Sequence, residues 1–153
     1  VMQGIETLSV RMEKHCANAE KMVEYLLGHE SVAWVSHPSA PDHPDYELAK
    51  KLLPKGRGSM IAFGIKGGKD AGVAFINNVK LASHLANVGD TRTLVIHPAS
   101  GTHSQMDEET LKFAGLSQDM IRLSVGIEDI DDIKNDFENG FRAAKKPRLA
   151  SNQ

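Results

Sequence analysis

Apolar residues recur every three or four positions near the start of the chain, and this spacing places them on one side of a helix. The series consists of Ile5, Leu8, Met12, Ala19, Met22 and Leu26. Gly28 follows the last of them, and glycine readily adopts the left-handed conformation that closes many helices. The pattern therefore predicts a long helix from about Gly4 to Leu27.

Four short apolar segments, bounded by glycine or proline, are typical of β-strands. They cover residues 32–35, 59–65, 94–96 and 120–125. Helical spacing returns at Tyr46–Leu53, around 71–78, at 107–114 and at 130–145, whereas the proline-rich residues 37–44 are expected to be irregular. This succession predicts an α/β sandwich with a small sheet of about four strands and helices packed on one face. The pattern alone does not give the strand directions.

Length and composition narrow the classes of protein that are possible. The 153 residues are enough for one domain, and the 41% apolar and 25% charged contents are typical of globular chains. No run approaches the roughly 18 apolar residues of a transmembrane helix. The net charge of −2 gives no cationic field for nucleic acid. The single cysteine, Cys16, excludes an internal disulfide.

Several familiar site motifs are absent or incomplete. His37 and His43 share one loop and His97 and His103 flank another, but neither spacing places two imidazoles on one helix face, so we expect no metal site. The glycine-rich stretch 64–69 lacks the first glycine of a phosphate-binding loop. No Gly-x-Ser-x-Gly nucleophile elbow occurs, so a hydrolase triad has no serine to build on.

Arg122 is the residue that most resists a purely structural interpretation. It lies inside an apolar strand, where a buried guanidinium is costly unless an anion partners it. Its planar fork matches a carboxylate with two parallel hydrogen bonds. The alternative is that strand alternation places Arg122 on an exposed face.

Two segments carry a resemblance to a known family. Residues 122–128 read Arg-Leu-Ser-Val-Gly-Ile-Glu, and residues 97–100 read His-Pro-Ala-Ser. Together they resemble the C-terminal domain of the Cys/Met-metabolism family of pyridoxal 5′-phosphate (PLP) enzymes. The similarity extends over about residues 4–141. Residues 85–90, Leu-Ala-Asn-Val-Gly-Asp, look most like the O-acetylhomoserine sulfhydrylase branch, because synthase and lyase relatives usually carry Ser-Leu-Gly there.

The resemblance implies roles for three residues. Arg122 matches the family arginine that clamps the substrate's α-carboxylate. Asn87 matches a position, often serine in relatives, that lines the same pocket. Thr102 matches a residue that helps to place the substrate or the cofactor-bearing lysine. Gly101 stands where the branch usually has serine or threonine, so the contacts of this loop are expected to differ.

The resemblance also implies what the chain does not contain. In this family the Schiff-base lysine, the ring-stacking residue and the phosphate cradle all lie upstream of the matching segment. Residues 1–146 are therefore expected to form one C-terminal, substrate-side domain with a mainly antiparallel sheet, as in fold-type I PLP enzymes, followed by a frayed tail at 147–153. On this interpretation the chain holds no catalytic, cofactor-binding or metal-binding residue. Alone, it is expected to be inactive and not to bind PLP stably.

The leading hypothesis concerns the complete enzyme. It would convert O-acetyl-L-homoserine and sulfide to L-homocysteine and acetate, a step of methionine biosynthesis. The implied partners are an amino-acid substrate and the chain's own PLP-binding domain, in a cytoplasmic homotetramer, without nucleic acid or membrane. A cystathionine γ-synthase or lyase of the same family is one alternative. A non-catalytic amino-acid-binding module is the other.

Overall fold

Each segment predicted as a strand or helix within the described residues forms that element. The computed structural model describes residues 2–101, 113 and 115–145, so most of the predicted helix 107–114 and the tail 147–153 lie outside them. The helices are α1 (Met2–Glu6), α2 (Leu8–Leu27), α3 (Tyr46–Leu52), α4 (Gly68–Asn78) and α6 (Ile130–Lys145). The strands are β1 (Val32–Ser36), β2 (Met60–Ile65), β3 (Ser83–His84), β4 (Leu94–Ile96) and β5 (Met120–Ser124). Within these ranges, no helix combines the length and the apolar composition that crossing a membrane requires.

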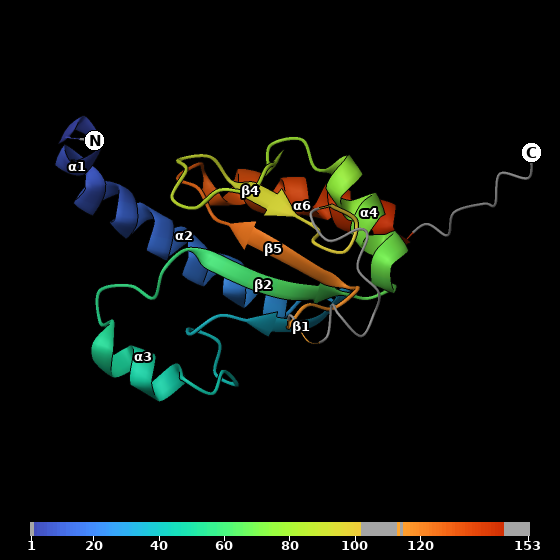
Figure 1. Cartoon of the computed structure of the whole chain (residues 1–153), viewed down its shortest axis with the longest axis horizontal. Helices are drawn as coiled ribbons and strands as arrows, with labels where there is room; N and C mark the ends of the chain where they lie inside the picture. The colour runs from blue at the N-terminus through green and yellow to red at the C-terminus, as the bar shows by residue number, and fades with distance from the viewer. Residues whose placement is uncertain (1, 102–112, 114, 146–153) are drawn as a thin grey trace, which may run out of the picture.

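The five strands form one sheet in the order β1-β2-β5-β4-β3 (Figure 1). β2 pairs antiparallel with both β1 and β5, and β5 pairs antiparallel with β4. The edge strand β3 pairs parallel with β4. The sheet is therefore mixed, although antiparallel pairs dominate as expected, and it has one strand more than the apolar pattern indicates. β3 is only two residues long, which is too short to produce an alternating pattern.

Helices α2, α4 and α6 cover one face of the sheet, as predicted, and the core lies between these two layers (Figure 1). Ile121 and Leu123 of β5 point into this core from the sheet and are fully buried. Four rings from β2, α4 and α6 form its aromatic centre, with ring centroids 4.9 to 6.4 Å apart: Phe63, Phe75, Phe137 and Phe141. Gly140 allows α6 to approach α4 closely, because a Cβ at this position would lie 2.6 Å from the ring of Phe75.

The structure divides the predicted first helix at Thr7, where the backbone leaves helical geometry (φ −104°, ψ 5°). The apolar series is buried only in its second half, which packs on the sheet. In the first half Ile5 is 61%, Leu8 43% and Met12 36% exposed. In Figure 1, α1 and the first turns of α2 project beyond the sheet. Half of the stripe therefore lacks a partner within the described residues.

Asp136 of α6 fixes the chain between α4 and β3. Its buried carboxylate accepts hydrogen bonds from the backbone amides of Lys80, at 2.7 Å, and Ala82, at 2.9 Å. Because Ala82 directly precedes β3, these two bonds hold the edge strand against α6. The segment that follows β3 contributes to the site described next.

Candidate functional site

Arg122 lies on the sheet face opposite the helices. Ile121 and Leu123 point into the core, so the alternating side chains of Arg122 and Ser124 point to the other face. In the sheet register Arg122 pairs with Ala62 on β2 and with Ile96 on β4. Apolar residues therefore flank the guanidinium-bearing side chain on both sides, and the arginine is half-buried rather than freely exposed.

Arg122 and Asn87 line the same small cavity. The residues around it come from β2, β4, β5 and the segment after β3: Met60, Leu85, Ala86, Asn87, Leu94, Ile96, Arg122 and Ser124. The space that the centre of a water molecule can occupy there is about 10 Å³, which is room for about one water molecule. The fold thus brings two of the three predicted site residues together across 35 positions of sequence. Thr102, the third, lies outside the described residues.

No carboxylate within the described ranges forms an ion pair with Arg122. Asp119 directly precedes β5 and is the acidic residue nearest to Arg122 in sequence, but its Oδ2 accepts a hydrogen bond from Trp34 Nε1 at 2.9 Å instead. Gly64 provides the room for this bond, because a Cβ there would collide with both partners. Arg122 therefore presents a positive charge on a largely apolar face, which is the arrangement that a carboxylate ligand requires.

The residues after Arg122 anchor the end of β5. The Glu128 carboxylate accepts hydrogen bonds from the backbone amide of Thr93, at 2.6 Å, and from its hydroxyl, at 2.8 Å. The Gly126 amide in turn donates to Thr93 Oγ1 at 3.0 Å. This network ties the chain leaving β5 to the residue preceding β4. In the Arg-Leu-Ser-Val-Gly-Ile-Glu motif, Arg122 thus lies at the small cavity, whereas Gly126 and Glu128 hold the end of β5 in place.

Two polar residues of α2 hold the same chain segment from the other side. His15 Nδ1 donates to the Val125 carbonyl at 2.6 Å. Asn18 Nδ2 donates to the carbonyls of Gly126, at 3.0 Å, and Glu128, at 2.8 Å. Both side chains are almost fully buried. Sequence reasoning missed them, although polar residues at helical spacing within an apolar stripe are a signal that could have identified them.

His97 shapes the turn of the His-Pro-Ala-Ser motif. Its Nε2 donates to the Gln118 carbonyl at 2.8 Å, since a carbonyl can only accept. The neutral ring then accepts at Nδ1 from the Ser100 hydroxyl at 2.8 Å. A Cβ on Gly72 of α4 would lie 2.6 Å from Nε2, so the helix packs directly on the ring. His97 therefore joins the end of β4 to the chain entering β5, a structural role that the motif did not reveal.

The free energy of unfolding is expected to fall as the pH drops below about 6.5. Burial lowers the pKa of His97 and of His37, which is also buried and also bonded to a carbonyl. Below 6.5, the ordinary value, the unfolded chain gains protons that the folded chain resists, so folding loses stability. Urea unfolding between pH 7.5 and 5.5 measures this slope. His97→Gln should flatten it, and an unchanged slope would contradict the prediction.

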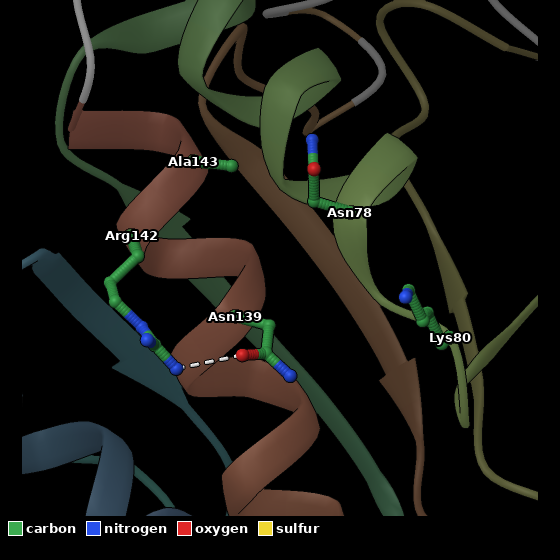
Figure 2. A pocket seen from close by; sticks show the side chains of 5 residues that line it. All are labelled: Asn78, Lys80, Asn139, Arg142 and Ala143. Carbon is green, nitrogen blue, oxygen red and sulfur yellow. Dashed lines mark hydrogen bonds between the residues drawn. The ribbon is translucent and has the colours of Figure 1, made fainter.

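Wider hollows lie away from Arg122. One of about 550 Å³ opens between α4 and α6 and is lined by Asn78, Lys80, Asn139, Arg142 and Ala143 (Figure 2). Arg142 Nη2 donates to Asn139 Oδ1 at 2.7 Å, and most of these side chains are exposed. Of the predicted site residues that the structure describes, neither Arg122 nor Asn87 lines this hollow. Across the described residues, no group of three or more His, Cys, Asp or Glu side chains is arranged to hold a metal ion.

The sequence of the chain is similar to the sequences of a family of enzymes. Residues 1–142 match the family described as Cys/Met metabolism PLP-dependent enzyme. O-acetyl-L-homoserine sulfhydrylase of Corynebacterium glutamicum is 54% identical over 93% of this chain and 32% of its own length. L-methionine γ-lyase of Fusobacterium nucleatum subsp. polymorphum is 45% identical over 92% of this chain and 35% of its own length.

A solved structure agrees with the fold. Cystathionine γ-synthase from Xanthomonas oryzae pv. oryzae, in complex with cystathionine, superposes with a TM-score of 0.84 and 36% identity, over 94% of this chain and 37% of that chain. The chain thus spans about a third of the length of the relatives it matches. The family match and the structural match agree. The chain belongs to the Cys/Met-metabolism family of PLP-dependent enzymes.

Proposed function

We propose that residues 1–146 form the substrate-side domain of an enzyme that converts O-acetyl-L-homoserine and sulfide to L-homocysteine and acetate. The observation that carries this proposal is the Arg122 side chain. It is a guanidinium on an apolar sheet face, in one cavity with Asn87, with no ion-pair partner in the described ranges. The 54% identity to a sulfhydrylase supports this reaction over others in the family.

Arg122 would bind the α-carboxylate of the amino-acid substrate through two parallel hydrogen bonds. A carboxylate held at one fixed point sets the orientation of the bonds at Cα and lowers the entropic cost of reaching the reactive geometry. Asn87, on the wall of the same cavity, would add an amide contact to the substrate. Thr102 is proposed as a third contact, from the loop that follows His97.

The side chains around Arg122 do not fit the PLP cofactor itself. PLP is held through a Schiff-base lysine and, when bound, supplies an electron sink for carbanion chemistry at Cα. Among the described residues, no lysine lines the Arg122 cavity, and the part of its wall that they form is apolar apart from Arg122, Asn87 and Ser124. We therefore propose that PLP is held by a part of the polypeptide outside this chain. The relatives have about two thirds of their length outside the matched region.

Two apolar surfaces are suited to contact that remaining part. On the sheet face that carries Arg122, Trp34, Met60 and Met120 are only partly buried. On the projecting helices, Ile5 and Leu8 are exposed. Large apolar residues that stay open to solvent in this way are suited to a protein contact. The inactivity of the 153-residue chain alone, the homotetramer and the cytoplasmic location stay predictions.

A product assay of the full-length polypeptide that contains this chain tests the proposed reaction. With O-acetyl-L-homoserine and sulfide, homocysteine is expected to form faster than cystathionine forms when cysteine replaces sulfide. The 153-residue chain alone is the matched control, and it should give neither product and keep no visible cofactor absorbance after dialysis. Faster formation of cystathionine would overturn the sulfhydrylase assignment.

A cystathionine γ-synthase is the second candidate. The structural match to the Xanthomonas enzyme, with a TM-score of 0.84 and 36% identity, supports membership of the family and leaves this candidate open. The same product assay distinguishes the two candidates, because they share the amino-acid substrate class and differ in the sulfur nucleophile. Amino-acid binding without either product would instead favour a non-catalytic module.

A further inference from the structure

The hydroxyl of Ser124 is a buried polar group without a hydrogen-bond partner among the described residues. Ser124 is 3% exposed, and its Oγ has almost no surface open to bulk solvent. Backbone pairing places it opposite Met60 and Leu94, both with apolar side chains. Burying a hydroxyl costs free energy unless it is hydrogen-bonded. A serine at this position therefore indicates a hydrogen-bond partner for its hydroxyl.

Ser124 lies on the wall of the Arg122 cavity. The two residues are separated by one position in β5 and therefore point to the same sheet face. Arg122, Asn87 and Ser124 are the polar side chains of that wall, and the others are apolar. The free space is about 10 Å³, enough for about one water molecule but not for an amino acid. A water in such a site needs two to four polar partners, and these three side chains can supply them.

We propose that Ser124 is a positioning residue for Arg122. Its hydroxyl would bond one water molecule in this cavity, and that water would accept a hydrogen bond from the guanidinium. The guanidinium would then be held in one orientation, with its fork directed away from the strand toward the substrate carboxylate. This inference rests on the proposed function of Arg122 and extends it to a residue that does not itself touch the substrate.

The competing explanation is that Ser124 is present only because a small side chain fits between its neighbours. Alanine satisfies that requirement equally well, so Ser124→Ala separates the two explanations. Ser31 offers a matched control, because it is 6% exposed and its Oγ is likewise buried and without a partner. It precedes β1 and does not line the cavity.

The first measurement is steady-state kinetics of the full-length enzyme. Ser124→Ala is expected to raise KM for the amino-acid substrate roughly tenfold, the scale of one hydrogen bond to a charged group. The kcat should change less than about twofold, because bound substrate is still oriented by the arginine fork. Ser124→Cys, which keeps the volume but bonds weakly, should fall between Ser124→Ala and the unmodified enzyme. Ser31→Ala should leave both constants unchanged.

The second measurement needs no substrate or cofactor. In the 153-residue chain, ¹⁵N–¹H spectra of the arginine side chains report the exchange of the Arg122 Nε–H with solvent. An N–H group held in a persistent hydrogen bond exchanges more slowly than one that is free, so Ser124→Ala should speed this exchange several-fold while Ser31→Ala does not.

The kinetics distinguish a failure of the proposed function from a failure of the positioning role alone. If Arg122→Ala leaves KM unchanged, the proposed function itself fails. If Arg122→Ala raises KM but Ser124→Ala changes neither KM nor the Nε–H exchange, only the positioning role is overturned.

Discussion

Replacing Arg122 by alanine in the full-length enzyme is expected to lower kcat/KM for the amino-acid substrate about a hundredfold to a thousandfold. Removing one partner of a desolvated, hydrogen-bonded charge pair costs about 2–5 kcal/mol, which corresponds to a loss of that order. The visible absorbance of the cofactor should persist, because no cofactor contact is assigned to Arg122. Steady-state kinetics, together with the absorbance spectrum, measures both quantities.

Two further variants sharpen this test. Arg122→Lys keeps the charge but not the planar fork, so it should recover only part of the lost kcat/KM. Arg142→Ala removes an exposed arginine on the opposite, helix-covered side of the sheet and should have no effect. Near-normal kinetics for Arg122→Ala would remove this residue from its assigned role. An equal loss for Arg142→Ala would point to a general effect of charge.

Gly126→Ala is expected to lower the free energy of unfolding by about 3 kcal/mol, at the upper end of the cost of overpacking a buried site. An added Cβ would lie 2.5 Å from both the Thr91 carbonyl oxygen and the Thr93 amide nitrogen, and would also collide with the Glu128 carboxylate. Backbone atoms cannot yield as a flexible side chain can. Relief of the collision must therefore break the bonds between Glu128 and Thr93.

Urea unfolding of the 153-residue chain, followed by circular dichroism, measures this loss. Gly4→Ala is the matched control, because nothing lies within 4 Å of a Cβ at that position. Its unfolding midpoint should stay the same or rise slightly, since alanine favours helix. If Gly126→Ala unfolds at the same urea concentration as the unmodified chain, the junction after β5 is not rigid in the way its bonds indicate.

Most of the fold could be predicted because the helices and strands that face the core have a regular spacing of apolar residues. The strand at 94–96 and the helix at 130–145 have the predicted bounds, since each is a continuous apolar run or a regular amphipathic series. β3 has no such pattern, because its two residues are set by pairing with β4 and by the bonds to Asp136 nearby. The break at Thr7 was equally hidden, because one apolar spacing runs through it.

The site was only partly predictable for a related reason. Arg122 was identifiable because a guanidinium in an apolar strand is costly unless an anion pairs with it. Its meeting with Asn87 follows from the pairing of β3, β4 and β5, which no local pattern contains. Ser124 was recognisable only as part of a family motif, because an isolated serine in a strand carries no signal of burial.

The hydrogen bonds between α2 and the end of β5 have a consequence for the order of folding. The bonds from His15 and Asn18 close a loop of 108 to 110 residues, whereas the paired strands and the α4–α6 contacts are nearer in sequence. Long loops lose more entropy on closure, and contacts across them form slowly. The end of β5, and with it the position of Arg122, is therefore expected to form late, after the sheet has assembled. A domain with most of its secondary structure formed would then not yet hold Arg122 in its final position.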